Sequence, residues 1–164
     1  MRNAIFALTM LALPFNAQAS AVQSVLPDAE IRGAATFRYF GFPVYRAQLF
    51  TKSGAPLDWS KDFGLELAYL RNLTETDLVE STMRELNRTG AALPVRGQLE
   101  QCFPDVRKGD RYAAISNGPN QIRFWHNGKQ VCTFSHPKIK NRFMSIFLGD
   151  NTRSTSFTQK LKGE

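Results

Sequence analysis

The chain has 164 residues, of which 43% are hydrophobic and 21% are charged. This balance suits one globular domain with a buried core and excludes a chain that is disordered throughout. The 21 Lys and Arg residues outnumber the 14 Asp and Glu residues, so the formal net charge of +7 permits an anionic partner without identifying one. Two cysteines and two histidines are too few for a cysteine-rich scaffold or a histidine-based metal centre.

The N-terminus has the pattern of a secretory signal peptide. Arg2 supplies a positive charge, and the apolar run from Ala4 to Phe15 is too short for a permanent membrane span. Small residues then follow at the spacing that a signal peptidase reads, and they predict cleavage after Ala19 or Ala21.

We therefore expect residues 1–21 to be a cleaved signal peptide and residues 22–164 to form one domain in the periplasm or outside the cell. No second long apolar stretch follows, so no transmembrane anchor is expected. Export argues against a nucleic-acid partner. We interpret the basic run Lys138–Arg142 as the solvated face of a helix.

The first half of the domain alternates as strands do. Gly33 to Thr51 predicts two strands joined by a short turn, because Gly41 and Pro43 interrupt the alternation. Phe63 to Leu70 predicts a third strand. The side chains expected on one face of this strand are Phe63, Leu65, Leu67 and Tyr69.

The next segments change to helical spacing. A helix capped by Thr74 or Thr76 is expected to end at Gly90, and a second helix opens at Pro94 and ends before Pro104. Two short strands follow, at Arg111–Ser116 and Gln121–His126.

Asn127-Gly128 predicts a two-residue hairpin turn after the second of these strands. The expected pairs are His126 with Lys129, Phe124 with Val131, and Arg123 with Cys132. Both faces of this ribbon carry apolar groups, so we expect it inside the sheet and not at an edge.

Two further helices complete the chain. One opens at Ser135 and Pro137 and ends at Gly149, and a short one spans Ser154 to Leu161. Runs of strands followed by helices on one side describe an α+β layered domain.

Cys102 and Cys132 are the only cysteines, one on the apolar stripe of a helix and one in a strand. An oxidising compartment would allow a disulfide between them, and two buried free thiols are the alternative. With His126 and His136 they reach the count of a four-ligand zinc site. The spacing lacks the close pairs that such sites use, so we expect no metal and no cofactor.

Five blocks in order resemble the exported bacterial branch of the chalcone isomerase-like family. They are GAATFRYFGFPVYRAQLF (33–50), LELAYLRNL (65–73), CFPDVRKGDRY (102–112), FWHNGK (124–129) and FMSIFLGDNT (143–152). The resemblance covers essentially the whole mature chain. It implies an open-faced β-sandwich, in which a long curved antiparallel sheet is backed by a layer of helices.

The plant enzymes of this superfamily use an arginine ahead of the first long strand, with a threonine and a tyrosine that hold a water near the substrate ketone. Here Arg32 adjoins Gly33, whereas the family's arginine position falls near Pro27. The threonine position falls at Tyr39 or Phe40. The resemblance therefore implies the scaffold without the isomerase site.

Other members of the superfamily bind fatty acids, with an arginine and a tyrosine on the carboxylate and an apolar cavity around the chain. The residues on the corresponding strands are Arg38, Tyr39, Tyr45, Arg46 and Tyr69. Strand alternation allows at most one residue of each adjacent arginine–tyrosine pair to point inward.

We thus expect a non-catalytic protein that binds a small apolar or amphipathic ligand such as a fatty acid. One alternative is an intramolecular lyase or isomerase with a rearranged acid–base set drawn from Arg38, Tyr45 or Tyr69. The other is a cell-envelope interaction module without a pocket. The sequence does not specify the oligomeric state.

Overall fold

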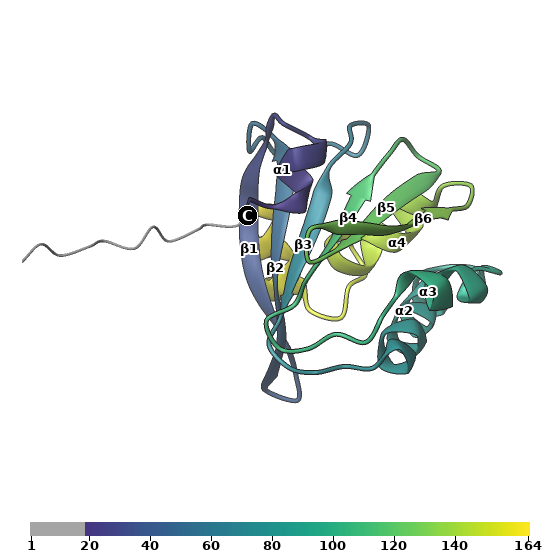
Figure 1. Cartoon of the computed structure of the whole chain (residues 1–164). Helices are drawn as coiled ribbons and strands as arrows, with labels where there is room; N and C mark the ends of the chain where they lie inside the picture. The colour runs from purple at the N-terminus through teal and green to yellow at the C-terminus, as the bar shows by residue number, and fades with distance from the viewer. Residues whose placement is uncertain (1–18) are drawn as a thin grey trace, which may run out of the picture.

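One antiparallel sheet organises the protein, and the computed structural model describes it within residues 19–164 (Figure 1). Most of the predicted signal peptide therefore lies outside the described residues. Six strands lie side by side in chain order, each paired with its sequence neighbour. They are β1 (Ala29–Tyr39), β2 (Phe42–Lys52), β3 (Gly64–Tyr69), β4 (Arg111–Ser116), β5 (Gln121–His126) and β6 (Lys129–Ser135). The α+β architecture expected from the sequence is confirmed.

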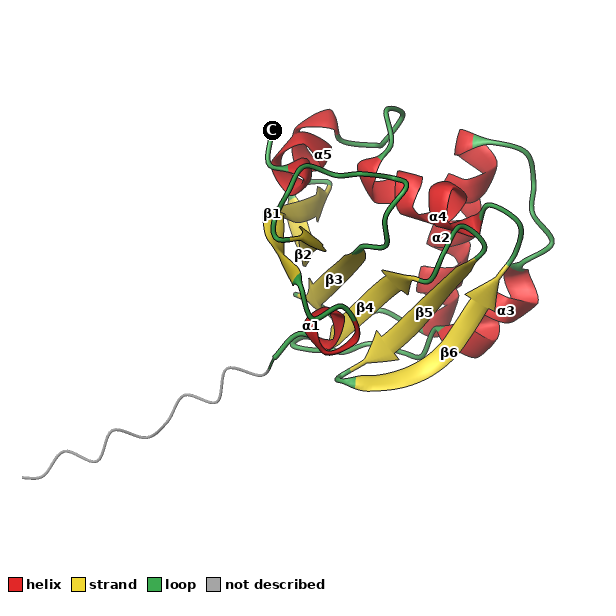
Figure 2. Ribbon diagram, turned by 90° about the horizontal axis from the view of Figure 1, so that it is seen from above, coloured by secondary structure: helices red, strands yellow, loops and turns green. Residues whose placement is uncertain are grey.

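Helices cover both faces of the sheet, but unequally (Figure 2). They are α1 (Ala21–Val25), α2 (Glu75–Thr89), α3 (Arg96–Cys102), α4 (Ile139–Leu148) and α5 (Thr155–Lys162). The four longer helices pack on one face, as predicted, whereas α1 packs on the other against Phe50 and Ile115. The prediction that the helices lie on one side of the sheet was therefore wrong for α1. None of the helices within residues 19–164 is long and apolar enough to cross a membrane.

The main core lies between the sheet and α2 to α5. The predicted face of β3 is confirmed, since Phe63, Leu65 and Tyr69 are buried there and Leu67 is partly buried. The fully buried side chains of this core include Phe63, Leu65, Leu86, Leu99, Phe124, Phe134, Ile139 and Met144. Each large apolar side chain buried in this way stabilises the fold by about 1.5–3 kcal/mol.

Helix α2 begins where the sequence predicted. The hydroxyl of Thr74 accepts a hydrogen bond from the backbone N–H of Asp77, and the Asp77 carboxylate accepts one in return from the Thr74 N–H. This reciprocal cap satisfies two backbone donors that the first turn leaves without partners. These hydrogen bonds also lower the pKa of the Asp77 carboxyl.

The β5–β6 hairpin differs from its predicted pairing. The turn at Asn127-Gly128 and the pair His126–Lys129 are confirmed, but the pairs then become Trp125–Gln130, Phe124–Cys132 and Arg123–Thr133. Val131 is an extra residue on β6, a β-bulge that shifts the register by one. The shift places Cys132 on the same face as Phe124, toward the helices, where the predicted register would have put it opposite Arg123.

Strand β6 is an edge strand, so the prediction that the whole ribbon lies inside the sheet was wrong; only β5 is interior. Helix α3 compensates by covering this edge. The Gln98 side chain of α3 donates to the carbonyl of Ser135 at 3.0 Å and accepts from its N–H at 3.0 Å. Backbone groups that an edge would leave unpaired are thereby satisfied.

Candidate functional site

A cavity of about 510 Å³ opens between the sheet and α2, next to the segment that joins α4 to α5. Its apolar lining comes from Phe37, Tyr39, Val44, Tyr45, Leu67, Leu73, Tyr69, Leu78, Ile146, Phe147 and Phe157. We call this space the main cavity. Its volume falls within the range of about 300–1,000 Å³ that is usual for small-molecule sites.

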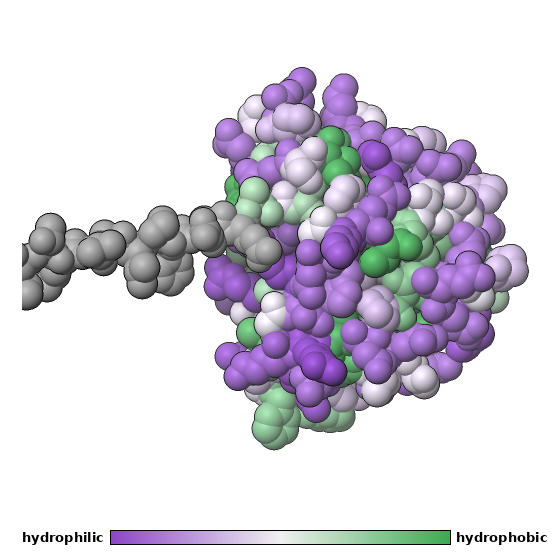
Figure 3. Space-filling model, in the orientation of Figure 1, coloured by the Kyte–Doolittle hydropathy of each residue, from purple (hydrophilic) through white to green (hydrophobic). Residues whose placement is uncertain are grey.

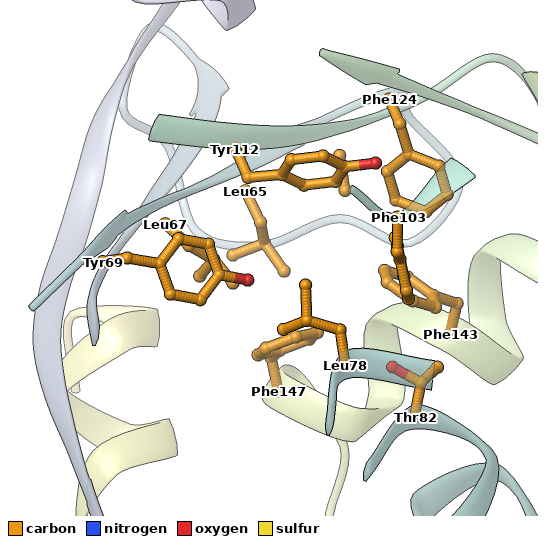
Figure 4. A pocket seen from close by; sticks show the side chains of 11 residues that line it. Leu65, Leu67, Tyr69, Leu78, Thr82, Phe103, Tyr112, Phe124, Phe143 and Phe147 are labelled. Carbon is orange, nitrogen blue, oxygen red and sulfur yellow. The ribbon is translucent and has the colours of Figure 1, made fainter. Parts of the chain in front are cut away.

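A smaller inner cavity of about 60 Å³ adjoins it deeper in the core. Figure 4 shows Tyr69 and Tyr112 entering this space from the sheet, and Leu78 and Thr82 from α2. The residues that line both cavities are Leu67, Tyr69, Leu78, Thr82 and Phe147. Because the two linings share these side chains, rotamer changes there could extend the main cavity into the core.

The mouth of the main cavity is polar. The polar and charged side chains that line it are Arg71, Asn72, Asp77, Glu80, Ser81, Arg84, Glu85, Thr152, Arg153 and Ser154. An apolar interior with a charged border suits a ligand that is itself apolar over most of its length and charged at one end.

Glu85 is a buried carboxylate at this border, held between two arginines. Its Oε2 atom accepts hydrogen bonds from Nε and Nη2 of Arg88 at 2.9 and 2.7 Å, and its Oε1 atom forms an ion pair with Nε of Arg153. Arg88 also donates to the side chain and the carbonyl of Asn151. Two guanidinium groups and one carboxylate leave a net charge of about +1 beside the cavity.

Two tyrosine hydroxyls lie within the lining. Burial raises the pKa of Tyr45, and the neighbouring Tyr69 and Glu85 raise it further, while burial alone raises the pKa of Tyr69. The Tyr45 ring is stacked on Phe37, with centroids 5.2 Å apart. Both phenols therefore remain protonated at neutral pH and can donate hydrogen bonds to an anionic or carbonyl group.

Strand alternation places some of the five predicted site residues in the main cavity and the others on the opposite face of the sheet. Tyr39, Tyr45 and Tyr69 line the main cavity, whereas Arg38 and Arg46 are exposed and are not part of its lining. Arg38 donates instead to the carbonyl of Gly41 at 3.1 Å. The structure thus brings the tyrosines together and leaves both predicted arginines outside.

Arg153 and Glu85 were missed by the sequence reasoning. Arg153 lies between α4 and α5, where no periodicity indicates a facing. The charge of Glu85 is typical of a solvated helix position, although its place seven residues after Leu78, two turns along the same face, could have indicated an inward direction. Arg32, the arginine nearest to the isomerase position, donates from Nε to the carbonyl of Lys162 at 2.9 Å and so holds the end of α5.

Cys102 and Cys132 are joined by a disulfide with a Cα–Cα distance of 5.4 Å. The bond connects the end of α3 to β6. Neither cysteine lines the main cavity, but Phe103, the residue after Cys102, lines the inner cavity.

Comparison with solved structures identifies the fold. The chain matches the crystal structure of a fatty-acid binding protein from Arabidopsis thaliana with a TM-score of 0.65 over 83% of this chain and 87% of that chain, at 8% sequence identity. The protein therefore has the chalcone isomerase-like fold, with its open antiparallel sheet and layer of helices. No protein-family model and no curated protein sequence matches the chain.

Proposed function

We propose that this protein binds an amphipathic acid such as a fatty acid, with the alkyl chain in the main cavity and the carboxylate at Arg153. The observation that carries the proposal is a cavity of about 510 Å³ that is apolar inside and has Arg153 at its polar border, paired with the buried Glu85. Burial of the chain contributes about 0.8 kcal/mol for each methylene group. The fold shared with a fatty-acid binding protein supports this proposal.

Of the three arginines that line the cavity, Arg71, Arg84 and Arg153, we choose Arg153 for the carboxylate because it interacts electrostatically with the buried Tyr45. Its Nε atom is engaged with Glu85, but its two terminal nitrogens donate no hydrogen bond to any residue within 19–164. A carboxylate accepts two parallel hydrogen bonds from such a group. The protonated hydroxyl of Tyr45, whose pKa both Glu85 and Arg153 influence, supplies a further donor.

The acid–base alternative is less well supported by the same groups. A tyrosine that acts as a general base must lose its proton near the working pH. Burial of Tyr45 and Tyr69 raises the pKa of each, which opposes this loss. Arg38 lies outside the cavity lining. We therefore propose a binding role without catalysis, and the cavity supports this role over a module without a pocket.

The test is displacement of a fluorescent fatty-acid analogue from delipidated protein. Arg153→Gln removes a charge-assisted contact and should weaken binding by about 10–100-fold. The matched control is Arg46→Gln, an exposed arginine on the opposite face of β2, which should bind like the wild type. Equal affinities for the two variants would contradict the proposed head-group site. A chalcone substrate should react no faster with the protein than in buffer.

We further propose that the protein acts after export, in the periplasm or outside the cell. The apolar run and small residues at the N-terminus support this location, and so does a disulfide, which persists in oxidising compartments. Cell fractionation followed by thiol alkylation should find the protein outside the cytoplasm, with both cysteines unreactive until reduced.

A further inference from the structure

The turn between β1 and β2 carries three aromatic side chains into solvent. Phe40 is 84% exposed, Phe42 67% and Tyr39 47%, and we call these residues the aromatic tip. The tip forms an apolar protrusion at the lower end of the β1–β2 hairpin (Figure 3). Inside the fold each phenylalanine would gain the full stabilisation of burial, but here most of that stabilisation is lost.

The backbone at the tip is also unfavourable for its residues. Phe40 and Gly41 have φ angles of 47° and 80°, nearly the same as Asn127 and Gly128 at 48° and 82° in the other tight hairpin. This left-handed conformation suits Asn and Gly, whereas a bulky residue adopts it at a conformational cost. The chain therefore holds a phenylalanine where its own second hairpin has the preferred asparagine. The ring of Phe40 packs edge-on against Tyr39, with centroids 4.5 Å apart, but it remains 84% exposed, so this contact returns little of the conformational cost. Such an exception indicates a functional contact.

The charged side chains of the hairpin nearest the tip are positive, and its one acidic residue, Glu30, lies at the opposite end, paired with Thr51. No Asp or Glu occurs from residue 33 to residue 57, a segment that contains Arg38, Arg46 and Lys52. Leu70 donates its N–H to the carbonyl of Val44 at 2.9 Å, which places the next residue, Arg71, beside the hairpin. Arg71 is exposed. Aromatic rings at the end of a hairpin, with cations behind them, suit an anionic lipid surface. The rings insert between the lipids, and the arginines contact the anionic headgroups.

We propose that the aromatic tip docks the protein on an anionic lipid bilayer. A second copy of the chain fits this surface less well. Three side chains at the end of a hairpin provide far less than the roughly 1,000 Å² that a stable protein interface buries, and two copies would bring their arginines together. A bilayer requires no complementary shape and contributes the opposite charge.

Docking would also place the cavity mouth at the lipid surface. Tyr39 belongs to both the tip and the lining of the main cavity, and Val44 and Arg71 line the cavity next to it. An amphipathic acid could then pass between bilayer and cavity without crossing bulk water. This second step rests on the proposed function, whereas docking itself depends on the tip alone.

The experiment is co-sedimentation of the disulfide-bonded protein with vesicles of phosphatidylcholine, with and without phosphatidylglycerol. The wild type should bind the anionic vesicles and lose binding as salt is added. Phe40→Asn places the preferred residue in the turn, so it should fold at least as stably as the wild type while binding vesicles about tenfold more weakly. The control Ile31→Ser removes an exposed apolar side chain near the other end of β1 and should leave vesicle binding unchanged.

Failure of the docking proposal and failure of the proposed fatty-acid function give different results. Docking is overturned if the wild type does not bind anionic vesicles, or if Phe40→Asn binds them as well as the wild type does. It is also overturned if sedimentation without vesicles shows a dimer that Phe40→Asn abolishes. Fatty-acid displacement in vesicle-free buffer should be equal for the wild type and Phe40→Asn. Failure of that assay alone, with vesicle binding intact, would reject the proposed ligand and leave docking supported.

Discussion

Three of the four tyrosines have their hydroxyl groups inside the fold. Burial raises the pKa of Tyr45, Tyr69 and Tyr112, and the Tyr112 hydroxyl donates to the carbonyl of Cys102 at 2.6 Å. The folded protein therefore keeps three protons that the unfolded chain releases above a pH of about 10. The stabilisation that follows is complete below this pH and is lost as the pH rises toward the folded-state pKa values.

We predict that the free energy of unfolding falls steeply above about pH 10, by about 1.4 kcal/mol per pH unit for each of these tyrosines. Urea unfolding at several alkaline pH values measures the slope. Tyr45→Phe removes one titrating group, so its slope should be smaller than that of the wild type by about 1.4 kcal/mol per pH unit. A slope unchanged by this substitution would show that Tyr45 ionises equally in both states.

The direction of a single side chain could be predicted wherever the strand or helix repeat determines which face it lies on. Alternation correctly separated Tyr45 from Arg46, because neighbouring strand residues must point to opposite faces. It could not choose which face met the helices for Arg38 and Tyr39. Arg153 lies in an irregular segment, and its position beside Glu85 depends on how α4 and α5 pack, which local sequence does not specify.

Among the elements, α5 depends on a close approach to β1. A Cβ atom at Gly33 would overlap the carbonyl oxygens of Lys160 and Leu161, which belong to the last turn of α5. Phe157 of the same helix packs edge-on against Phe37, with ring centroids 5.7 Å apart. The absence of a side chain at Gly33 thus sets the separation between the helix and the sheet.

We predict that Gly33→Ala destabilises the fold by about 1–3 kcal/mol, because α5 must move away from β1. The control is Gly97→Ala in α3, where an added Cβ meets no atom within 4 Å. That change should stabilise the protein by about 0.5–1 kcal/mol through helix propensity. Thermal unfolding of both variants gives the comparison, and equal melting temperatures would contradict the close approach.

Helix α1 favours one of the two predicted cleavage positions. The Ser20 side chain accepts from the N–H of Val22 at 3.1 Å as the N-cap of α1, and its hydroxyl donates to the buried Glu66 at 2.9 Å. Cleavage after Ala21 would remove this cap, at a cost of about 0.5–2 kcal/mol. We propose cleavage after Ala19, so the mass of the exported protein should correspond to a chain that begins at Ser20. A chain that begins at Val22 would contradict this.

Most elements could be predicted because their signals are local: Thr74 with Asp77 caps α2, and Asn127-Gly128 fixes a hairpin turn. The bulge at Val131 was not predictable, since a two-residue turn specifies register only up to the first irregularity. What favours the bulge is the bond from Cys132 to Cys102, a contact between residues 30 positions apart. Helix α1 was also missed, because its N-cap Ser20 and its first residue Ala21 belong to the predicted signal peptide.

At the scale of the whole molecule, the disulfide ties α3 to the edge strand β6. Its sequence separation of 30 residues predicts that closing this loop stabilises the fold by about 3–4 kcal/mol, by restricting the unfolded chain. Guanidinium unfolding with and without a reductant measures this difference. The double variant Cys102→Ala, Cys132→Ala should have about the stability of the reduced wild type, both with and without reductant. A wild type equally stable with and without reductant would contradict the prediction.

Because α5 is the last helix to be synthesised, the apolar residues of β1 and β2 that it covers stay uncovered during translation. Ribosomes make the first hairpin early and the final helix last, yet Leu161 and Phe157 of that helix cover the apolar side of this hairpin. Phe37 and Tyr45 therefore lack this cover until translation is complete. A holding chaperone that binds extended apolar segments should protect the nascent chain from aggregation throughout its production.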